Sequence, residues 1–175
     1  MKIIFLDIDG VLNSVNGMMK KGKDDFWNDN PTEESIHWLN KIIEHTKAKV
    51  VISSTWRQNV CSTMMWRFLA LLGFKGEVID NTPRLQGCKR GTEIQAWLSV
   101  YQDKLETYGA NSNWNTRADG PIESFVILDD DSDMSHLMKH LVKCDTKFGL
   151  TENEALKAIE HLNAKEYDNE ISKEV

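Results

Sequence analysis

The stretch KIIFLDIDGVLN at residues 2–13 constrains the fold more than any other part of the sequence. Its apolar residues 3–6 predict a strand that is buried on both faces, as in a parallel sheet. Two carboxylates, Asp7 and Asp9, follow at once, and Gly10 lets the chain leave the sheet. Because side chains alternate along an extended chain, we expect both carboxylates to point to the same side of the strand end.

Further apolar runs alternate with helical patterns, and this alternation predicts the fold class. Strands are predicted at residues 49–53, 77–79, 125–128 and 141–144. Apolar stripes at helical spacing predict helices around residues 36–43, 65–72, 94–101 and 155–162. We therefore expect an α/β protein with a doubly wound, mostly parallel sheet, in which ligands bind beyond the carboxyl ends of the strands.

Two segments between these elements read as loops. Residues 14–29 and 102–121 are predicted as loops, the second because it is rich in turn residues. Asn30 is expected to cap the helix after the first loop, with Pro31 as the first helical residue. Neither residues 14–29 nor residues 80–90 are long enough for a second folded unit, so we expect no large cap domain over the site.

The composition suits one domain with a hydrophobic core. The chain has 175 residues, of which 41% are hydrophobic, and we expect a single domain at 1–163 with a charged, frayed tail at 164–175. A net charge of -6 argues against a broad basic surface for nucleic acid. The three cysteines show no C-x-x-C spacing and no stretch could span a bilayer, so we expect a cytoplasmic protein without a membrane partner.

Reactive side chains follow three of the predicted strands. Asp7 and Asp9 follow the first, Ser53 and Ser54 the second, and the run DDDSD at 129–133 the fourth. Carboxylates from two strand ends would repel each other in one crevice unless a cation lay between them, and oxygen ligands without His or Cys favour Mg²⁺. Helix capping alone would explain the run at 129–133, but it does not explain a matching pair after the first strand.

These same stretches resemble a known superfamily. FLDIDGVLN resembles the first motif of the haloacid dehalogenase (HAD) superfamily, and VVISS, KRG and FVILDDDSD resemble its second, third and fourth motifs in the same order. SSTWR, RGTEIQAWL and ILDDDSDM also look like a small cap-less HAD subgroup, some of whose relatives are attached to RNA-repair proteins. The resemblance implies a Mg²⁺-dependent phosphomonoesterase that forms an aspartyl-phosphate.

The resemblance also implies roles for individual residues. Asp7 would attack phosphorus, and Asp9 would protonate the leaving group and then deprotonate water. An acid rather than Thr at position 9 favours a phosphatase or phosphomutase over an ATPase. Ser53 would donate a hydrogen bond to a phosphoryl oxygen.

Two assignments remain open within the resemblance. Either Lys89 or Arg90 would neutralise charge on Asp7 and the phosphate, since Lys is the conventional residue type and Gly follows Arg90 directly. The metal ligands besides Asp7 and Asp9 are expected to be Asp129 and Asp130, with Asp133 in support; spacing from the strand end would instead pair Asp129 with Asp133.

An open site suits a large substrate. Trp56 could stack on a base and Arg57 could bind a phosphate, although both could instead pack at the start of a helix. Ser54 and Asp133 are further candidates for contact with substrate. We therefore expect a phosphorylated substrate, with a nucleotide or polynucleotide end ahead of a phosphoprotein.

Other classes of function remain possible from the sequence. A receiver-like signalling domain is also doubly wound with acids around Mg²⁺, and its acceptor Asp follows the third strand. Here Asp80 comes at the end of the third predicted strand, but no Thr of the fourth strand or Lys of the fifth lies in a good position, so the pattern does not match. A catalytically silent HAD fold could serve as a binding module, although every expected acid is present. The sequence does not indicate an oligomeric state.

Overall fold

The protein was analysed as a computed structural model that describes residues 1–20, 30–108 and 120–164. Its centre is a sheet of five parallel strands in the order β3-β2-β1-β4-β5. The strands are β1 (Lys2–Leu6), β2 (Lys49–Ile52), β3 (Val78–Asn81), β4 (Ser124–Asp129) and β5 (Leu141–Lys143). This sheet confirms the predicted α/β class with a doubly wound, parallel arrangement.

The first apolar run of the sequence forms the central strand. Ile4 of β1 lies between Val50 of β2 and Val126 of β4 in the two neighbouring ladders. Residues 3–6 are all fully buried, because helices cover both faces of the sheet. A continuous apolar run is what a strand in this position requires.

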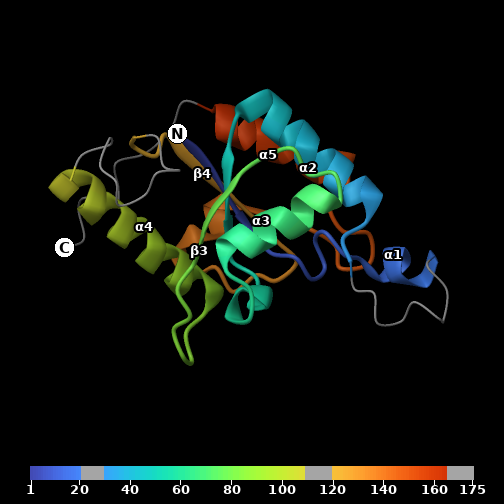
Figure 1. Ribbon diagram of the computed structural model, residues 1–175, viewed down its shortest axis with the longest axis horizontal. Helices are drawn as coiled ribbons and strands as arrows, with labels where there is room; N and C mark the ends of the chain where they lie inside the picture. Colours follow the sequence, from blue (N-terminus) through green and yellow to red (C-terminus); the bar gives the residue numbers. More distant parts are fainter. Residues whose placement is uncertain (21–29, 109–119, 165–175) are drawn as a thin grey trace.

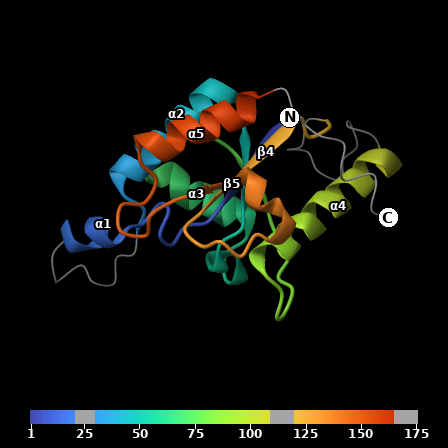
Figure 2. The same cartoon turned by 180° about the vertical axis from the view of Figure 1, so that it is seen from behind.

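Helices form one layer on each face of the sheet (Figures 1 and 2). One layer contains α2 (Glu33–Thr46), α3 (Ser62–Leu71) and α5 (Glu152–Asn163), which pack over Ile4 and Leu6 of β1. The other contains α4 (Arg90–Tyr108) and the 3₁₀ helix η3 (Ser135–His140), which pack over Ile3 and Phe5. Alternate residues of one strand therefore supply two separate cores.

Two short elements lie beyond the carboxyl ends of the strands. They are α1 (Val15–Lys20), which follows the turn after β1 and lies at the right-hand side of the molecule in Figure 1, and the 3₁₀ helix η2 (Thr55–Gln58), which follows β2. No described helix combines the length and the apolar character needed to cross a membrane. The described residues also contain no large cap domain, as the sequence predicted.

Local boundaries differ from the predictions in three places. Residues 15–20 of the first predicted loop are helical, and α4 continues to Tyr108 because QDKLET at 102–107 consists mainly of good helix formers. The cap of α2 is Thr32 rather than Asn30, since the Thr32 hydroxyl accepts a hydrogen bond from the Ser35 amide at 3.1 Å. The predicted tail beyond Ala164 lies outside the described residues.

Two histidines join η3 to α5 beside β4. Nδ1 of His140 lies 3.0 Å from Nε2 of His161, and the His140 ring lies 4.0 Å from the ring of Phe125, centroid to centroid. Burial lowers the pKa of His140 to about 4 and also lowers the pKa of His161. Both rings are therefore held in the neutral form at neutral pH.

This pair predicts a destabilising contribution from His140 in mild acid. Between about pH 6.5 and 4 the unfolded chain binds a proton at His140 that the folded chain does not, so the contribution of His140 to the free energy of unfolding falls as pH falls. Solvent reaches part of the ring, so we expect this contribution to have a slope below about 1.4 kcal/mol per pH unit. Thermal unfolding across this range should show that wild type loses stability relative to His140→Gln as pH falls. His37→Gln, at an exposed site, should keep the wild-type slope, and parallel curves for wild type and His140→Gln would contradict the expectation.

Candidate active site

The carboxyl ends of the three central strands converge at one edge of the sheet. Asp7 follows β1, Ser53 follows β2 and Asp129 ends β4. The sheet ladder continues into the site, because the Asp7 amide donates to Leu128 O and the Ser53 amide donates to Leu6 O, each at 2.9 Å. The backbone of the reactive residues is therefore as rigid as the core strands.

Three carboxylates form a compact cluster here. Asp7, Asp129 and Asp130 each offer an oxygen within 4.8 Å of the others. Asp7 is 7% exposed and Asp129 is fully buried. Burial raises the pKa of Asp7, and burial together with the charge of Asp7 raises the pKa of Asp129 to about 7. A cation between the three oxygens would remove this repulsion, so the cluster could hold a metal ion.

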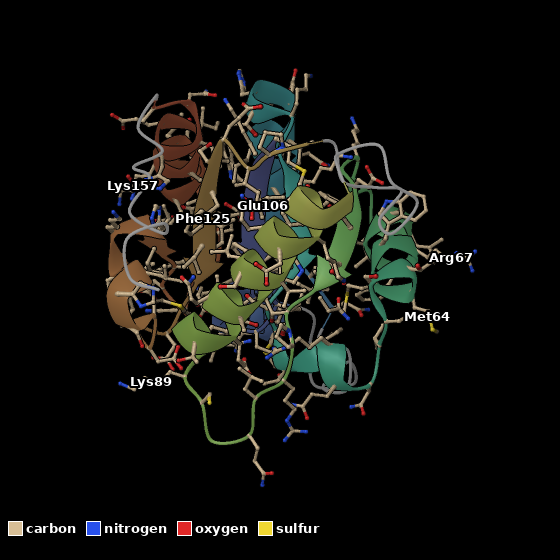
Figure 3. The ribbon with its side chains drawn as sticks, turned by 90° about the vertical axis from the view of Figure 1, so that its left-hand side faces the viewer. Met64, Arg67, Lys89, Glu106, Phe125 and Lys157 are labelled. Carbon is tan, nitrogen blue, oxygen red and sulfur yellow. The ribbon has the colours of Figure 1, made fainter. Side chains whose placement is uncertain are left out.

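The guanidinium of Arg90 lies against the same carboxylates. Arg90 is the first residue of α4. Its Nη2 lies 3.5 Å from Asp7 Oδ2, and its Nε lies 3.6 Å from Asp129 Oδ2. Lys89 is exposed, and Figure 3 shows it at the start of α4, pointing away from the sheet. The structure thus brings Arg90 to the carboxylates, and it does not bring Lys89 there.

Several buried polar atoms of the site have no hydrogen-bond partner among the described residues. They are Ser53 Oγ, Arg90 Nη1 and Asp129 Oδ2. Leaving such an atom unsatisfied costs about 1–3 kcal/mol. Two of the groups are donors suited to an anion and one is an acceptor suited to a cation. The site is therefore incomplete in the way expected of one that binds a metal ion together with a phosphate group.

Gly10 and Asp130 depend on each other. Gly10 has a φ of +73°, and a Cβ atom there would lie 2.2 Å from Asp130 Oδ2. The same oxygen accepts a hydrogen bond from the Thr146 hydroxyl at 2.8 Å. The glycine after the first strand is therefore required by the backbone angle and by the position of a carboxylate in the cluster.

Asp9 stands apart from the cluster as an exposed side chain with its own donors. Asn13 donates from Nδ2 to Asp9 Oδ1 at 2.8 Å. Trp56 donates from Nε1 to both oxygens of Asp9, at 3.1 Å each. The sequence did not reveal either contact, although Asn13 lies only four positions after Asp9 and that spacing was a usable signal.

Ser54 and Arg57 hold the loop after β2 in place. Ser54 is fully buried and caps η2, and its hydroxyl also lowers the pKa of Asp7 through a hydrogen bond. Arg57 donates to the carbonyls of Ser53 and Ser54 and to the carboxylate of Glu93. Arg57 and Glu93 expose only 5% and 8% of their side chains. Contact between Arg57 and substrate therefore remains a prediction. The contacts in the structure show instead that Arg57 connects the loop after β2 to Glu93 of α4.

The two remaining acids of the run at 129–133 lie outside the cluster. Asp133 accepts a hydrogen bond from the Arg90 amide at 2.9 Å, so it anchors the start of α4 and lies outside the three-carboxylate cluster. Asp131 is exposed. Glu93 was missed by the sequence reading; besides Arg57 it binds the Leu85 amide at 2.9 Å, and nothing in its local spacing indicated this.

The chain matches a known protein-family model. Residues 3–155 match the family described as the HAD domain in Swiss Army Knife RNA repair proteins. Because the match covers most of the chain, the chain belongs to this family, and the resemblance read from the four motifs is confirmed. Searches among curated proteins and among solved structures found no match.

Substitution of Gly10 tests its dependence on Asp130. Gly10→Ala should displace the Asp130 carboxylate and weaken binding of a divalent cation by about tenfold or more. Gly87→Ala is the matched control, because Gly87 has a φ of +74° with no atom within 4 Å of its Cβ position. Both variants carry the strain of a left-handed backbone, about 1–2 kcal/mol. Equal cation affinity in the two variants, measured by calorimetry, would contradict the proposed clash.

Loss of the buried ion pair should destabilise the fold. Glu93→Ala leaves the Arg57 guanidinium buried without its carboxylate, and we expect the free energy of unfolding to fall by about 3–5 kcal/mol in urea titrations. Glu44→Ala removes the exposed pair between Glu44 and Lys41 and should leave the free energy of unfolding nearly unchanged, because water and salt screen that pair. A similar cost for both variants would show that the Arg57–Glu93 pair is not the link described here.

Proposed function

We propose that this HAD-family domain is a Mg²⁺-dependent phosphomonoesterase that works through a phosphorylated Asp7. The observation that carries the proposal is the meeting of the carboxylate cluster with the unsatisfied donors of Ser53 and Arg90. An anionic phosphate and a cation would together satisfy both sets of groups. Membership of the HAD family supports hydrolase chemistry at the aspartate after β1.

The reaction would proceed in two displacements. In the first, an Asp7 oxygen forms a bond to phosphorus while the bond to the leaving oxygen breaks, and the Asp9 carboxylic acid gives its proton to that oxygen. In the second, the resulting Asp9 carboxylate takes a proton from water as the water oxygen attacks phosphorus, which releases phosphate and restores Asp7. Asp9 thereby returns to its acid form, and the cycle balances.

The protein groups around Asp7 suit these steps. Ser53 Oγ and Arg90 Nη1 would each donate a hydrogen bond to phosphoryl oxygens, and both are buried and unsatisfied without them. The side chains of Asp7, Asp129 and Asp130, with the Asp9 carbonyl, would hold Mg²⁺. When bound, the ion would neutralise charge on the transferring phosphoryl group. Asp133 would act indirectly, through the anchored start of α4.

The proposed substrate is a nucleotide or a polynucleotide end. The description of the family as a domain of RNA repair proteins supports this choice. The described residues contain no large cap domain that would restrict the site to small metabolites. A phosphoprotein is the alternative of the same chemistry. All three cysteines are free, which fits the proposed cytoplasmic setting.

Phosphate release from a panel of substrates tests the proposal. The panel comprises an aryl phosphate, nucleotides, oligonucleotides with 3′- or 5′-phosphates and a phosphopeptide, each with Mg²⁺ or a chelator. We expect turnover that chelation abolishes and that Asp7→Asn lowers by more than about 10³-fold, because that variant lacks the nucleophile. Asp131→Asn, which changes an exposed acid of the same run, should retain wild-type activity.

The panel also separates the alternatives. Preference for the phosphopeptide would overturn the polynucleotide assignment but retain the phosphatase. Absence of turnover on every substrate, with normal Mg²⁺ binding, would contradict the phosphatase and favour a catalytically silent binding module.

A further inference from the structure

We infer that Trp56 is a positioning residue that orients the Asp9 carboxyl for proton transfer to the leaving group. This inference rests on the proposed function, because it assigns a hydrogen-bonding partner to Asp9, the general acid of the proposed reaction. It replaces the role that the sequence suggested for Trp56, a surface on which a base stacks. The polar edge of the indole, rather than its aromatic face, carries the role.

The contact joins the first and second motifs of the site. Nε1 of Trp56 lies 3.1 Å from each oxygen of Asp9, so one N–H is shared between both oxygens. Asn13 approaches one of these oxygens at 2.8 Å from the other side of the first-motif turn. Two donors from separate loops therefore fix the plane of the Asp9 carboxyl as well as its direction.

Asp9 needs such support more than Asp7 does. The Asp7 side chain is almost fully buried and is restrained by packing and by its contact with Arg90. Asp9 is exposed, and an exposed aspartate samples several orientations in water. Since a misplacement of about 1 Å can cost about a hundredfold in rate, an acid at an open site requires external restraint.

Trp56 is well placed to provide that restraint. Its ring is half-buried, lies 5.9 Å from the ring of Phe68 in α3 and packs against the core beneath α2 and α3. The Ser54 hydroxyl accepts a hydrogen bond from the Trp56 amide, which fixes the backbone of η2. The indole is thus anchored at its apolar side and presents its N–H to Asp9, a combination that only tryptophan among the aromatic residues offers in this geometry.

The inference predicts a dependence on the leaving group. An alkoxide is a poor leaving group and needs a proton from Asp9 as the bond to phosphorus breaks, whereas an activated phenolate leaves without one. The quantity kcat/KM reports only the steps up to departure of the leaving group, so it isolates proton donation from the later attack of water. A variant with a poorly oriented Asp9 should lose kcat/KM on alkyl phosphates and retain it on activated aryl phosphates.

The decisive variant is Trp56→Phe, which keeps an aromatic face but has no N–H. We expect kcat/KM to fall roughly 10- to 100-fold on an alkyl phosphate and less than about threefold on p-nitrophenyl phosphate. Trp66→Phe is the matched control, because the Trp66 indole also donates a hydrogen bond, to Gly76 O at 3.0 Å, at a distance from the site. This control should retain wild-type values on both substrates.

Other outcomes would overturn the inference. Equal losses on both substrates would indicate a purely structural role for Trp56, and unchanged kinetics would show that the N–H is dispensable. Increased activity on the alkyl phosphate would show that Trp56 holds Asp9 in an unproductive position. A rise in KM confined to oligonucleotides would restore the stacking role.

A second measurement does not depend on turnover. The indole ¹H–¹⁵N signal of Trp56, identified by its loss in Trp56→Phe, should move in Asp9→Ala and stay in place in Asp131→Asn. An unmoved signal in Asp9→Ala would refute the contact itself. Absence of activity in wild type together with a moved signal would instead contradict the proposed phosphatase while the contact stands, so the two failures are distinguishable.

Discussion

The repulsion between the buried carboxylates of Asp7 and Asp129 is the constraint around which this protein is organised. Neighbouring parallel strands, β1 and β4, end side by side, and their register brings the two acids to the same edge of the sheet. Burial at such a place disfavours charge on both groups, and the pKa of Asp129 rises to about 7 as a result. A chain that keeps both acids ionised here must provide cations, and Arg90 supplies part of that charge at 3.5 and 3.6 Å.

The surrounding polar contacts fix the elements that bring Arg90 and Ser53 to the buried carboxylates. Asp133 binds the backbone amide of Arg90 and so fixes where α4 begins. Farther along the first turns of α4, Glu93 pairs with Arg57, whose guanidinium also binds two carbonyls of the loop after β2. The helix α4, which carries the Arg90 guanidinium, is thus linked to the end of β2, which carries Ser53. The link fixes the relative position of Ser53 and Arg90, the two proposed phosphate donors.

The sequence predicted the features that depend on the order of neighbouring residues along the chain. Buried strands are continuous apolar runs, so the sheet and the acids at its edge could be read from residues 2–13 and 125–133. Contacts between distant segments could not be read in this way, because spacing along the chain does not reveal which side chain fills a given gap. Glu93 was missed for this reason. The choice between Lys89 and Arg90 likewise depended on knowing the residue at which α4 begins. Neighbouring residues at the start of a helix point in different directions, so one side chain faces the carboxylates and the other faces solvent.

In the proposed reaction, the difference between Asp7 and Asp9 lets one short turn serve two chemical roles. A nucleophile that is held in place by packing can be buried, because only one oxygen must reach phosphorus. A proton donor must meet leaving groups of many shapes, and at a site without a large cap it has to lie near the surface. Asp9 meets that requirement by being exposed, and its orientation then has to come from neighbours instead of from packing. In this proposal, the indole of Trp56 and the amide of Asn13 supply that orientation through their hydrogen bonds to the carboxyl.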